Sequence, residues 1–196
     1  MTTGQKPETG PTDSRLDTVS NLIDGCGDFQ IRIGMDGTWY YRDSPIRRAG
    51  LVKLFARTLR RETDGTYWMV TPAERGRIEV EDAPFLAVEM DAAGADREQI
   101  LTFRTNLDDT VEAGESHPLR VDFTPGGHEP RPYILLRNGL EARLTRSVFY
   151  HLVALGCFDD RAPEASGEGG SAGEGLDFGV WSNGKFFSLG TLAETV

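Results

Sequence analysis

Apolar and polar residues alternate over much of the chain, and this period of two predicts β-strands. Four Asx-Gly dipeptides interrupt the alternation, and Asx-Gly accepts the positive φ that tight hairpin turns require. Three of them have alternating or aromatic runs on both sides, which predicts hairpins at 36–37, 138–139 and 183–184. The fourth, at 64–65, is expected to link a helix to a strand. Further strands are predicted over 77–80, 85–90, 100–104 and 119–123, with 85–90 central because it is apolar on both faces.

Helical spacing of apolar residues occurs in three places. Residues 45–61 are predicted to form a helix, with Ser44 as its cap and Pro45 in its first turn. A second helix is expected over 146–156, with Thr145 as its cap. Near the N-terminus, a short amphipathic helix is predicted because apolar residues recur at spacings of 3, 3 and 1; these are Leu16, Val19, Leu22 and Ile23.

The two longer helices follow similar sequence contexts at an offset of 95 residues, with a β run, a turn and then an amphipathic helix. This favours an α+β, β-rich fold of two small domains with repeated hairpin-plus-helix motifs. The alternative is that any α+β chain aligns with itself this loosely. We expect a disordered tail over 1–14, an N-terminal domain over 15–93, and a C-terminal domain over 94–196. The stretch 162–176, rich in Gly and Glu, is expected to be a flexible loop.

The net charge of −10 disfavours non-specific binding of nucleic acid or of an anionic membrane surface. No apolar run approaches the length of a membrane-spanning helix, and the first 14 residues lack the apolar segment of a secretory signal. The two cysteines, Cys26 and Cys157, are far apart and form no CxxC pair. These observations favour reduced thiols and a cytoplasmic protein.

Three groups of residues carry candidate chemistry. The helix predicted over 45–61 has six basic residues and no acid, which indicates a docking face for an anionic ligand or acidic partner, or else a solvated face. Glu79, Glu81 and Asp82 can supply oxygen ligands to a hard cation, or serve as ordinary strand-edge acids. Thr, Asn and Asp over 105–109 follow a predicted strand, and suit either a polar ligand or an Asx turn.

Common catalytic signatures are missing from the sequence. It contains no HExxH, Walker loop, GxSxG elbow or zinc-type Cys/His spacing, so neither a cofactor nor a metal is predicted. This removes the common enzyme classes without excluding catalysis.

The run DFQIRIGMDGTWYY from Asp28, followed in order by Ser44-Pro45-Ile46, LVKLF from Leu51, Val70-Thr71-Pro72, VEDAPF from Val80 and FRTN from Phe103, resembles a bacterial family. That family is the domain of unknown function 1285, and the resemblance covers about residues 22–190. It implies a two-domain fold with repeated structural motifs and a role in ligand binding or signal transduction. It supplies no catalytic residues. The segment 162–176 and Ala73 depart from the family pattern.

The leading hypothesis is a module that binds a small ligand or a protein partner, with a role in signalling. Two domains tend to leave a cleft, which is the usual place for a ligand. We expect aromatic walls, an arginine for an anionic group, and polar residues for orientation. The residues expected there are Trp39, Tyr41, Glu74, Glu81, Asp82, Arg104, Thr105 and Asn106. The alternatives are a metal-assisted hydrolytic enzyme using Glu79, Glu81 and Asp82, and an interaction protein that docks through the basic helix 45–61.

Overall fold

The structure, a computed structural model, describes residues 27–124, 129–158 and 175–193. The expected tail over 1–14, the amphipathic segment from Leu16 to Ile23, and Cys26 lie outside these residues. So does most of the expected loop over 162–176, but its last two residues begin a strand. No helix among the described residues has the length and apolar character needed to cross a membrane.

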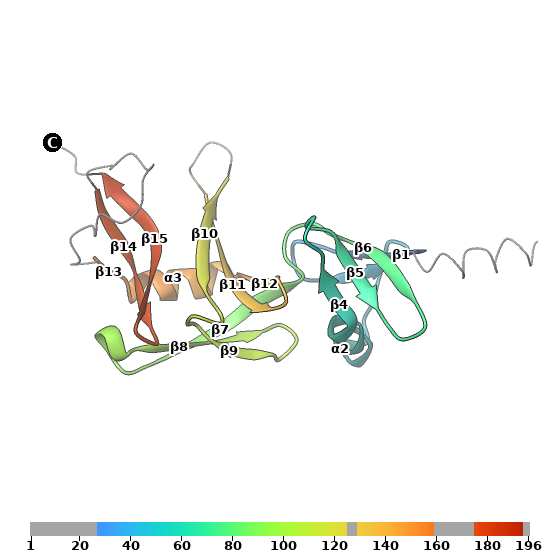
Figure 1. Cartoon of the computed structure of the whole chain (residues 1–196), viewed down its shortest axis with the longest axis horizontal. Helices are drawn as coiled ribbons and strands as arrows, with labels where there is room; N and C mark the ends of the chain where they lie inside the picture. The colour runs from blue at the N-terminus through green and yellow to red at the C-terminus, as the bar shows by residue number, and fades with distance from the viewer. Residues whose placement is uncertain (1–26, 125–128, 159–174, 194–196) are drawn as a thin grey trace, which may run out of the picture.

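Two six-stranded sheets make up most of the fold, and Figure 1 shows them side by side along the long axis. The first contains β1 (Gly27–Ile33), β2 (Trp39–Tyr41), β3 (Ser44–Pro45), β4 (Leu59–Arg61), β5 (Tyr67–Val70) and β6 (Arg75–Val80). The second contains β7 (Phe85–Ala93), β8 (Ile100–Thr105), β9 (Thr110–Glu112), β10 (Leu119–Phe123), β11 (Pro130–Arg137) and β12 (Leu140–Leu144). The 3-10 helix η1 (Asp96–Glu98) joins β7 to β8.

Both sheets have the same topology. The first has the strand order β3-β2-β1-β6-β5-β4, and the second, counted from its β9 edge, has the order β9-β8-β7-β12-β11-β10. Each therefore consists of two antiparallel three-stranded meanders joined by a parallel central pair, β1 with β6 and β7 with β12. The repeating unit of the fold is this sheet.

The helices do not follow that repeat. Helix α2 (Ala49–Thr58) lies between the third and fourth strands of the first sheet, whereas α3 (Arg146–Ala154) follows the sixth strand of the second. The alignment at offset 95 pairs β2 with β11, which belong to different meanders. The predicted β-rich α+β fold is confirmed, but a repeated hairpin-plus-helix motif is not.

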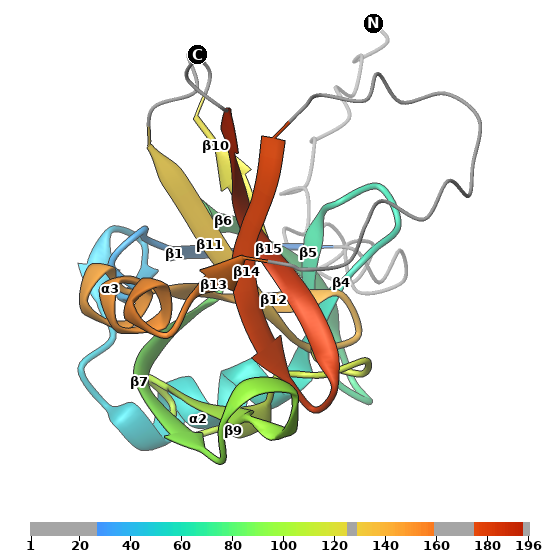
Figure 2. The ribbon, with the colours of Figure 1, turned by 90° about the vertical axis from the view of Figure 1, so that its left-hand side faces the viewer.

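A third sheet covers the end of the second one. It has the order β13 (Cys157–Phe158), β14 (Gly175–Ser182) and β15 (Lys185–Ala193). Figure 2 looks at this end, where β15 lies beside β10. The buried Ser182 accepts a 3.0 Å hydrogen bond from the Leu101 amide and donates one of 2.7 Å to the Ala113 carbonyl, which holds the β14–β15 hairpin against β8 and β9.

The helix predicted over 45–61 is shorter at both ends than expected. Pro45 pairs with Tyr40 as part of β3, and the extended residue before the helix is Arg48 rather than Ser44. At the other end Leu59 is fully buried and pairs with Met69, so sheet formation replaces the last helical turn. The turn at 64–65 is consequently a β4–β5 hairpin, not a link between a helix and a strand. Thr145 does precede the second helix as predicted.

The break between the two sheets lies between β6 and β7, over residues 81–84. A boundary at 93/94 would assign β7 to the first domain, but β7 pairs with β8 and β12 in the second sheet. One continuous apolar core extends through both sheets. Its largest fully buried side chains are Trp39, Phe85, Phe103, Ile33, Leu59, Leu101, Ile134, Leu140, Leu152 and Val180.

Candidate functional site

A small hollow of about 180 Å³ lies where α2 of the first sheet meets the turn after β8 and the end of β11. We call it the basic cleft. It brings together the two halves of the molecule, and three of its side chains are cationic. Its lining residues are Lys53, Ala56, Arg57, Leu107, Asp109 and Arg137.

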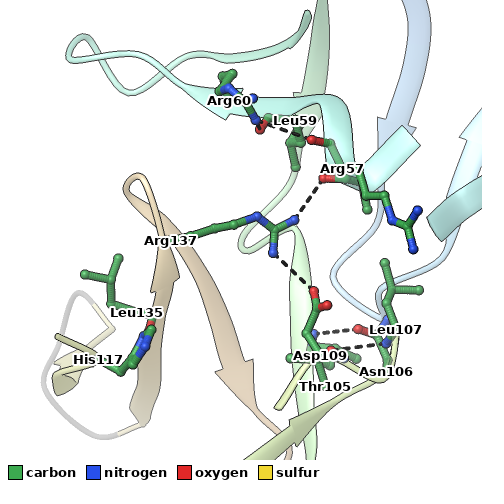
Figure 3. A network of polar contacts seen from close by, with 12 residues as sticks. Arg57, Leu59, Arg60, Thr105, Asn106, Leu107, Asp109, His117, Leu135 and Arg137 are labelled. Atoms are coloured by element: carbon green, nitrogen blue, oxygen red, sulfur yellow. Dashed lines mark hydrogen bonds and ion pairs between the residues drawn. The ribbon is translucent and has the colours of Figure 1, made fainter. Parts of the chain in front are cut away.

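Arg137 crosses the basic cleft and joins its two sides. Its guanidinium donates a 3.0 Å hydrogen bond to the Ala56 carbonyl near the end of α2 and forms a 3.2 Å ion pair with Asp109 (Figure 3). It also lies over the ring of Phe85, at 5.4 Å from the ring centre. These contacts hold the half-buried guanidinium in one place without a ligand.

The turn over 105–109 aims Asp109 at Arg137. Thr105 is fully buried, and its hydroxyl accepts hydrogen bonds of 3.3 Å from the Leu107 amide and 3.1 Å from the Asp109 amide. Its own amide donates to the Asp109 carbonyl at 2.8 Å. The Thr105 hydroxyl therefore stabilises this turn, where the sequence had suggested an Asx turn as one of two alternatives.

Charged residues beside this turn form a series of linked ion pairs on the surface. Asp108 accepts a 2.5 Å hydrogen bond from Lys53 and one of 2.9 Å from Arg104. Arg104 also donates one of 2.7 Å to Glu89. The hydrogen bond and the positive charge of Lys53, with a smaller contribution from Arg104, lower the pKa of the Asp108 carboxyl. Arg104 therefore helps to position the turn and lies outside the lining of the basic cleft.

The eight residues predicted to share one cleft are spread over several places. Arg104 and Thr105 build the turn next to the basic cleft, and Asn106 bonds the Leu86 backbone, accepting from its amide at 3.1 Å. Trp39 belongs to the core and packs on Phe55, with ring centres 6.5 Å apart.

Tyr41 and Glu74 line a different hollow, of about 680 Å³, on the far side of α2. We call it the apolar groove, because apolar side chains make up most of its wall. These apolar side chains include Phe29, Tyr41, Ile46, Leu51, Leu54 and Phe55.

The acidic trio does not converge on one point. Glu81 pairs with Arg32 and accepts a 3.0 Å hydrogen bond from the Met35 amide, whereas Asp82 pairs with Arg143. Glu79 is exposed on β6 and lines a third, larger hollow. Among the described residues, no group of three or more His, Cys, Asp or Glu is placed to hold a metal ion. The hypothesis of a metal-assisted enzyme that uses Glu79, Glu81 and Asp82 is therefore not supported by their placement.

The six basic residues over 45–61 do not form one docking face. Only Lys53 and Arg57 belong to α2; two others precede it, and two lie on β4. On β4, Arg60 donates to the Leu59 carbonyl at 2.7 Å, and Arg61 donates to the Gly139 carbonyl at 3.3 Å. Of the six basic residues predicted to dock an anionic ligand or acidic partner, only Lys53 and Arg57 lie together on α2, where they line the basic cleft.

A polar cluster around Asp82 holds the segment between the sheets against the second sheet. Its carboxylate accepts hydrogen bonds of 2.6 Å from the Tyr133 hydroxyl and 2.8 Å from Arg143. Burial and the Asp82 hydrogen bond raise the pKa of Tyr133 to about 12. Arg120 stacks on the Tyr133 ring and binds Glu141 through two hydrogen bonds, of 2.6 and 2.8 Å. The carboxylates of Asp82 and Glu141 are thus both engaged in hydrogen bonds within this cluster.

Arg137 is a basic-cleft residue that the sequence did not point to, and Asp109 was a candidate only as part of the polar run 105–109. Arg137 precedes the Asn-Gly turn at 138–139, and Asp109 ends the polar run after β8. Each position is typical of a turn, so neither carries a signal of its own. Their pairing depends on how β8 and β11 are placed within the second sheet, which no local pattern encodes.

The fold and the site define a class: a β-rich α+β protein of two domains, each based on a six-stranded sheet, with a small basic cleft between them. Two family models match the chain. One is the N-terminal domain of DUF1285, a domain of unknown function, over residues 23–83; the other is the C-terminal domain of DUF1285, a protein of unknown function, over residues 84–189. The chain belongs to the DUF1285 family.

Two solved structures of the family are similar to this chain. A DUF1285 family protein from Silicibacter pomeroyi DSS-3 is 43% identical, with a TM-score of 0.74 over 85% of this chain and 82% of that one. A second, from Shewanella baltica OS155, is 28% identical, with a TM-score of 0.49 over 63% of this chain and 90% of that one. No curated protein matches the chain.

Proposed function

We propose that this protein is a binding module for a small anionic group, phosphate or carboxylate, held in the basic cleft. Three cations line the cleft against one carboxylate, Asp109, and that carboxylate is already paired with Arg137. The excess of positive charge stands out in a chain whose net charge is −10. Such a local reversal of charge favours an anion at this place and disfavours anions elsewhere on the surface.

The observation that carries the proposal is that the Arg57 guanidinium is available to a ligand. Its side chain is exposed at the rim of the cleft, and within the described part of the chain no carboxylate lies within ion-pair distance of it. Lys53 and Arg137, by contrast, both have acidic partners. A guanidinium presents several N–H donors in a planar fork that matches carboxylate and phosphate oxygens. Arg57 is therefore the group with which an incoming anion would pair.

The size of the cleft limits the ligand. A volume of about 180 Å³ is smaller than the roughly 300–1,000 Å³ typical of pockets for drug-sized molecules. It suits one anionic group, either a free ion or the end of a larger molecule. Arg137 is held in place before binding, so an anion there loses less free energy to the ordering of side chains.

The cleft's position supports a role in signalling. Lys53 and Arg57 belong to the first sheet's helix, and Arg137 to the second sheet. An anion bound by residues of both domains would add a contact that links the two domains. Binding would thus favour one relative placement of the domains, which a protein partner can sense.

Thermal unfolding of the full chain with 1–10 mM phosphate, oxalate or chloride at matched ionic strength tests the proposal. A ligand that binds only the folded state raises the stability by about 2.7 kcal/mol at 100 times its Kd. We expect phosphate or oxalate to raise the Tm above the chloride value, and Arg57→Gln to abolish the difference. Arg146→Gln, an exposed arginine at the start of α3, is the matched control and keeps it. Equal shifts in the wild type and Arg57→Gln would contradict the proposal.

A further inference from the structure

The apolar groove is a second feature of α2, on the helix face opposite the basic cleft. Lys53, Ala56 and Arg57 line the cleft, whereas Leu51, Leu54, Phe55 and Thr58 line the groove. With 3.6 residues per turn, these two sets point to opposite sides of the helix. The groove is therefore a surface separate from the basic cleft, and its occupant is independent of the anion proposed there.

Apolar side chains are unusually exposed along this groove. Leu54 is 56% exposed, Tyr41 46% and Leu51 37%. Single exposed apolar residues are ordinary, but several around one hollow of about 680 Å³ mark an interaction site. A groove of this kind, beside a helix and lined at intervals by aliphatic and aromatic side chains, suits the apolar face of an amphipathic helix.

We infer that the chain's own residues 16–23 occupy the apolar groove. This segment has apolar residues at helical spacing, namely Leu16, Val19, Leu22 and Ile23, which fall on one side of a helix. Asp17 and Asn21 fall on the other side. A helix of this length gains most of its stability from packing of its apolar face, so it requires a partner surface.

Chain connectivity brings the segment to the groove. The described chain begins at Gly27 in β1, and two residues later Phe29 is part of the groove wall. Four residue steps separate Ile23 from Gly27 and span at most about 14 Å when extended. The segment is thus tethered within reach of the groove, and its effective concentration there exceeds that of any separate molecule.

Hydrogen exchange on the full chain tests this inference. We expect the amides of residues 16–23 to exchange at least tenfold more slowly than in the urea-unfolded chain, and Leu54→Asp to abolish that protection. Leu54 is more than half exposed, so the variant should fold. The control is Tyr150→Asp on α3, where a residue 64% exposed receives the same charge away from the groove; it should leave the protection unchanged.

Substitution in the segment provides the reciprocal test. Leu22→Asp should lower the Tm and abolish the protection, whereas Asn21→Asp adds the same charge to the opposite face and should change neither. Unprotected amides over 16–23 in the wild type would overturn the inference. It would also be overturned if Leu54→Asp converted a dimer to a monomer in sedimentation while the protection persisted, because a second copy would then fill the groove. Neither result bears on phosphate binding, which depends on Arg57.

Discussion

The hydroxyl of Tyr133 on β11 donates a 2.6 Å hydrogen bond to the carboxylate of Asp82, in the segment that joins the two sheets. The two residues are 51 positions apart in the sequence. Because the Asp82 side chain is only 8% exposed and also binds Arg143, this contact fixes the segment between the domains to the second sheet. The relative placement of the domains therefore depends on a few buried polar groups as well as on the apolar core.

The raised pKa of Tyr133 predicts a pH-dependent loss of stability. In the folded protein this pKa is about 12, whereas an unfolded tyrosine titrates near ~10. Between these values the folded state binds more protons than the unfolded state, so stability falls as pH rises from about 10 towards 12. Urea unfolding at pH 9, 10 and 11 should show a shallower fall in Tyr133→Phe than in the wild type. Tyr67, whose pKa is also raised by burial, is common to both proteins and cancels in the difference. Parallel stability curves would rule out this role for Tyr133.

Replacing Asp82 should cost more than replacing its neighbour Glu81. Asp82→Asn weakens a mostly buried ion pair and leaves Arg143 without its carboxylate, which predicts a loss of about 2–3 kcal/mol. Glu81→Gln weakens a more exposed pair with Arg32, for which about 1 kcal/mol or less is expected. Free energies of unfolding from urea titrations at pH 7 measure both. Equal losses would show that the burial of Asp82 makes no difference.

Local patterns predicted the strands and most turns because these depend on nearby residues. Asn138 and Asn183 both have positive φ, as do the glycines that follow them, which is the backbone that Asn-Gly favours in hairpins. Local patterns predicted the wrong secondary structure where pairing with another strand determines the conformation of a residue. Pro45 suits a first helical turn, yet it pairs with Tyr40, and Leu59 fits the helical stripe, yet it pairs with Met69.

The candidate site was predictable only in part, for a related reason. The basic residues near α2 and the polar run after β8 were both selected from the sequence, and the basic cleft lies between them. The residue that joins them, Arg137, comes from β11 and reaches the Ala56 carbonyl, 81 positions away. A contact of that separation follows from how two sheets are placed, which periodicity and spacing do not determine.

Two glycines of the β14–β15 hairpin should respond differently to alanine. A Cβ at Gly179 would lie 2.2 Å from the Phe187 carbonyl oxygen on the paired strand, so the pairing would have to open, at a cost of about 3 kcal/mol. A Cβ at Gly184 has no neighbour within 4 Å, and only its φ of +71° opposes alanine, at about 1–2 kcal/mol. Thermal unfolding of both variants checks the order, and a larger loss for Gly184→Ala would contradict it.

The buried hydroxyl of Thr105 should be essential to the turn that positions Asp109. Thr105→Val keeps the shape of the side chain but leaves the Leu107 and Asp109 amides without their acceptor, a loss of about 1–3 kcal/mol. Thr105→Ser retains the hydroxyl and should lose less, because only a methyl group is removed. If Asp109 no longer holds Arg137, the response of the Tm to phosphate should also weaken in Thr105→Val and persist in Thr105→Ser. Urea titration and thermal unfolding with phosphate measure the two effects separately, and a valine variant as stable as the serine variant would show that the hydroxyl does not hold the turn.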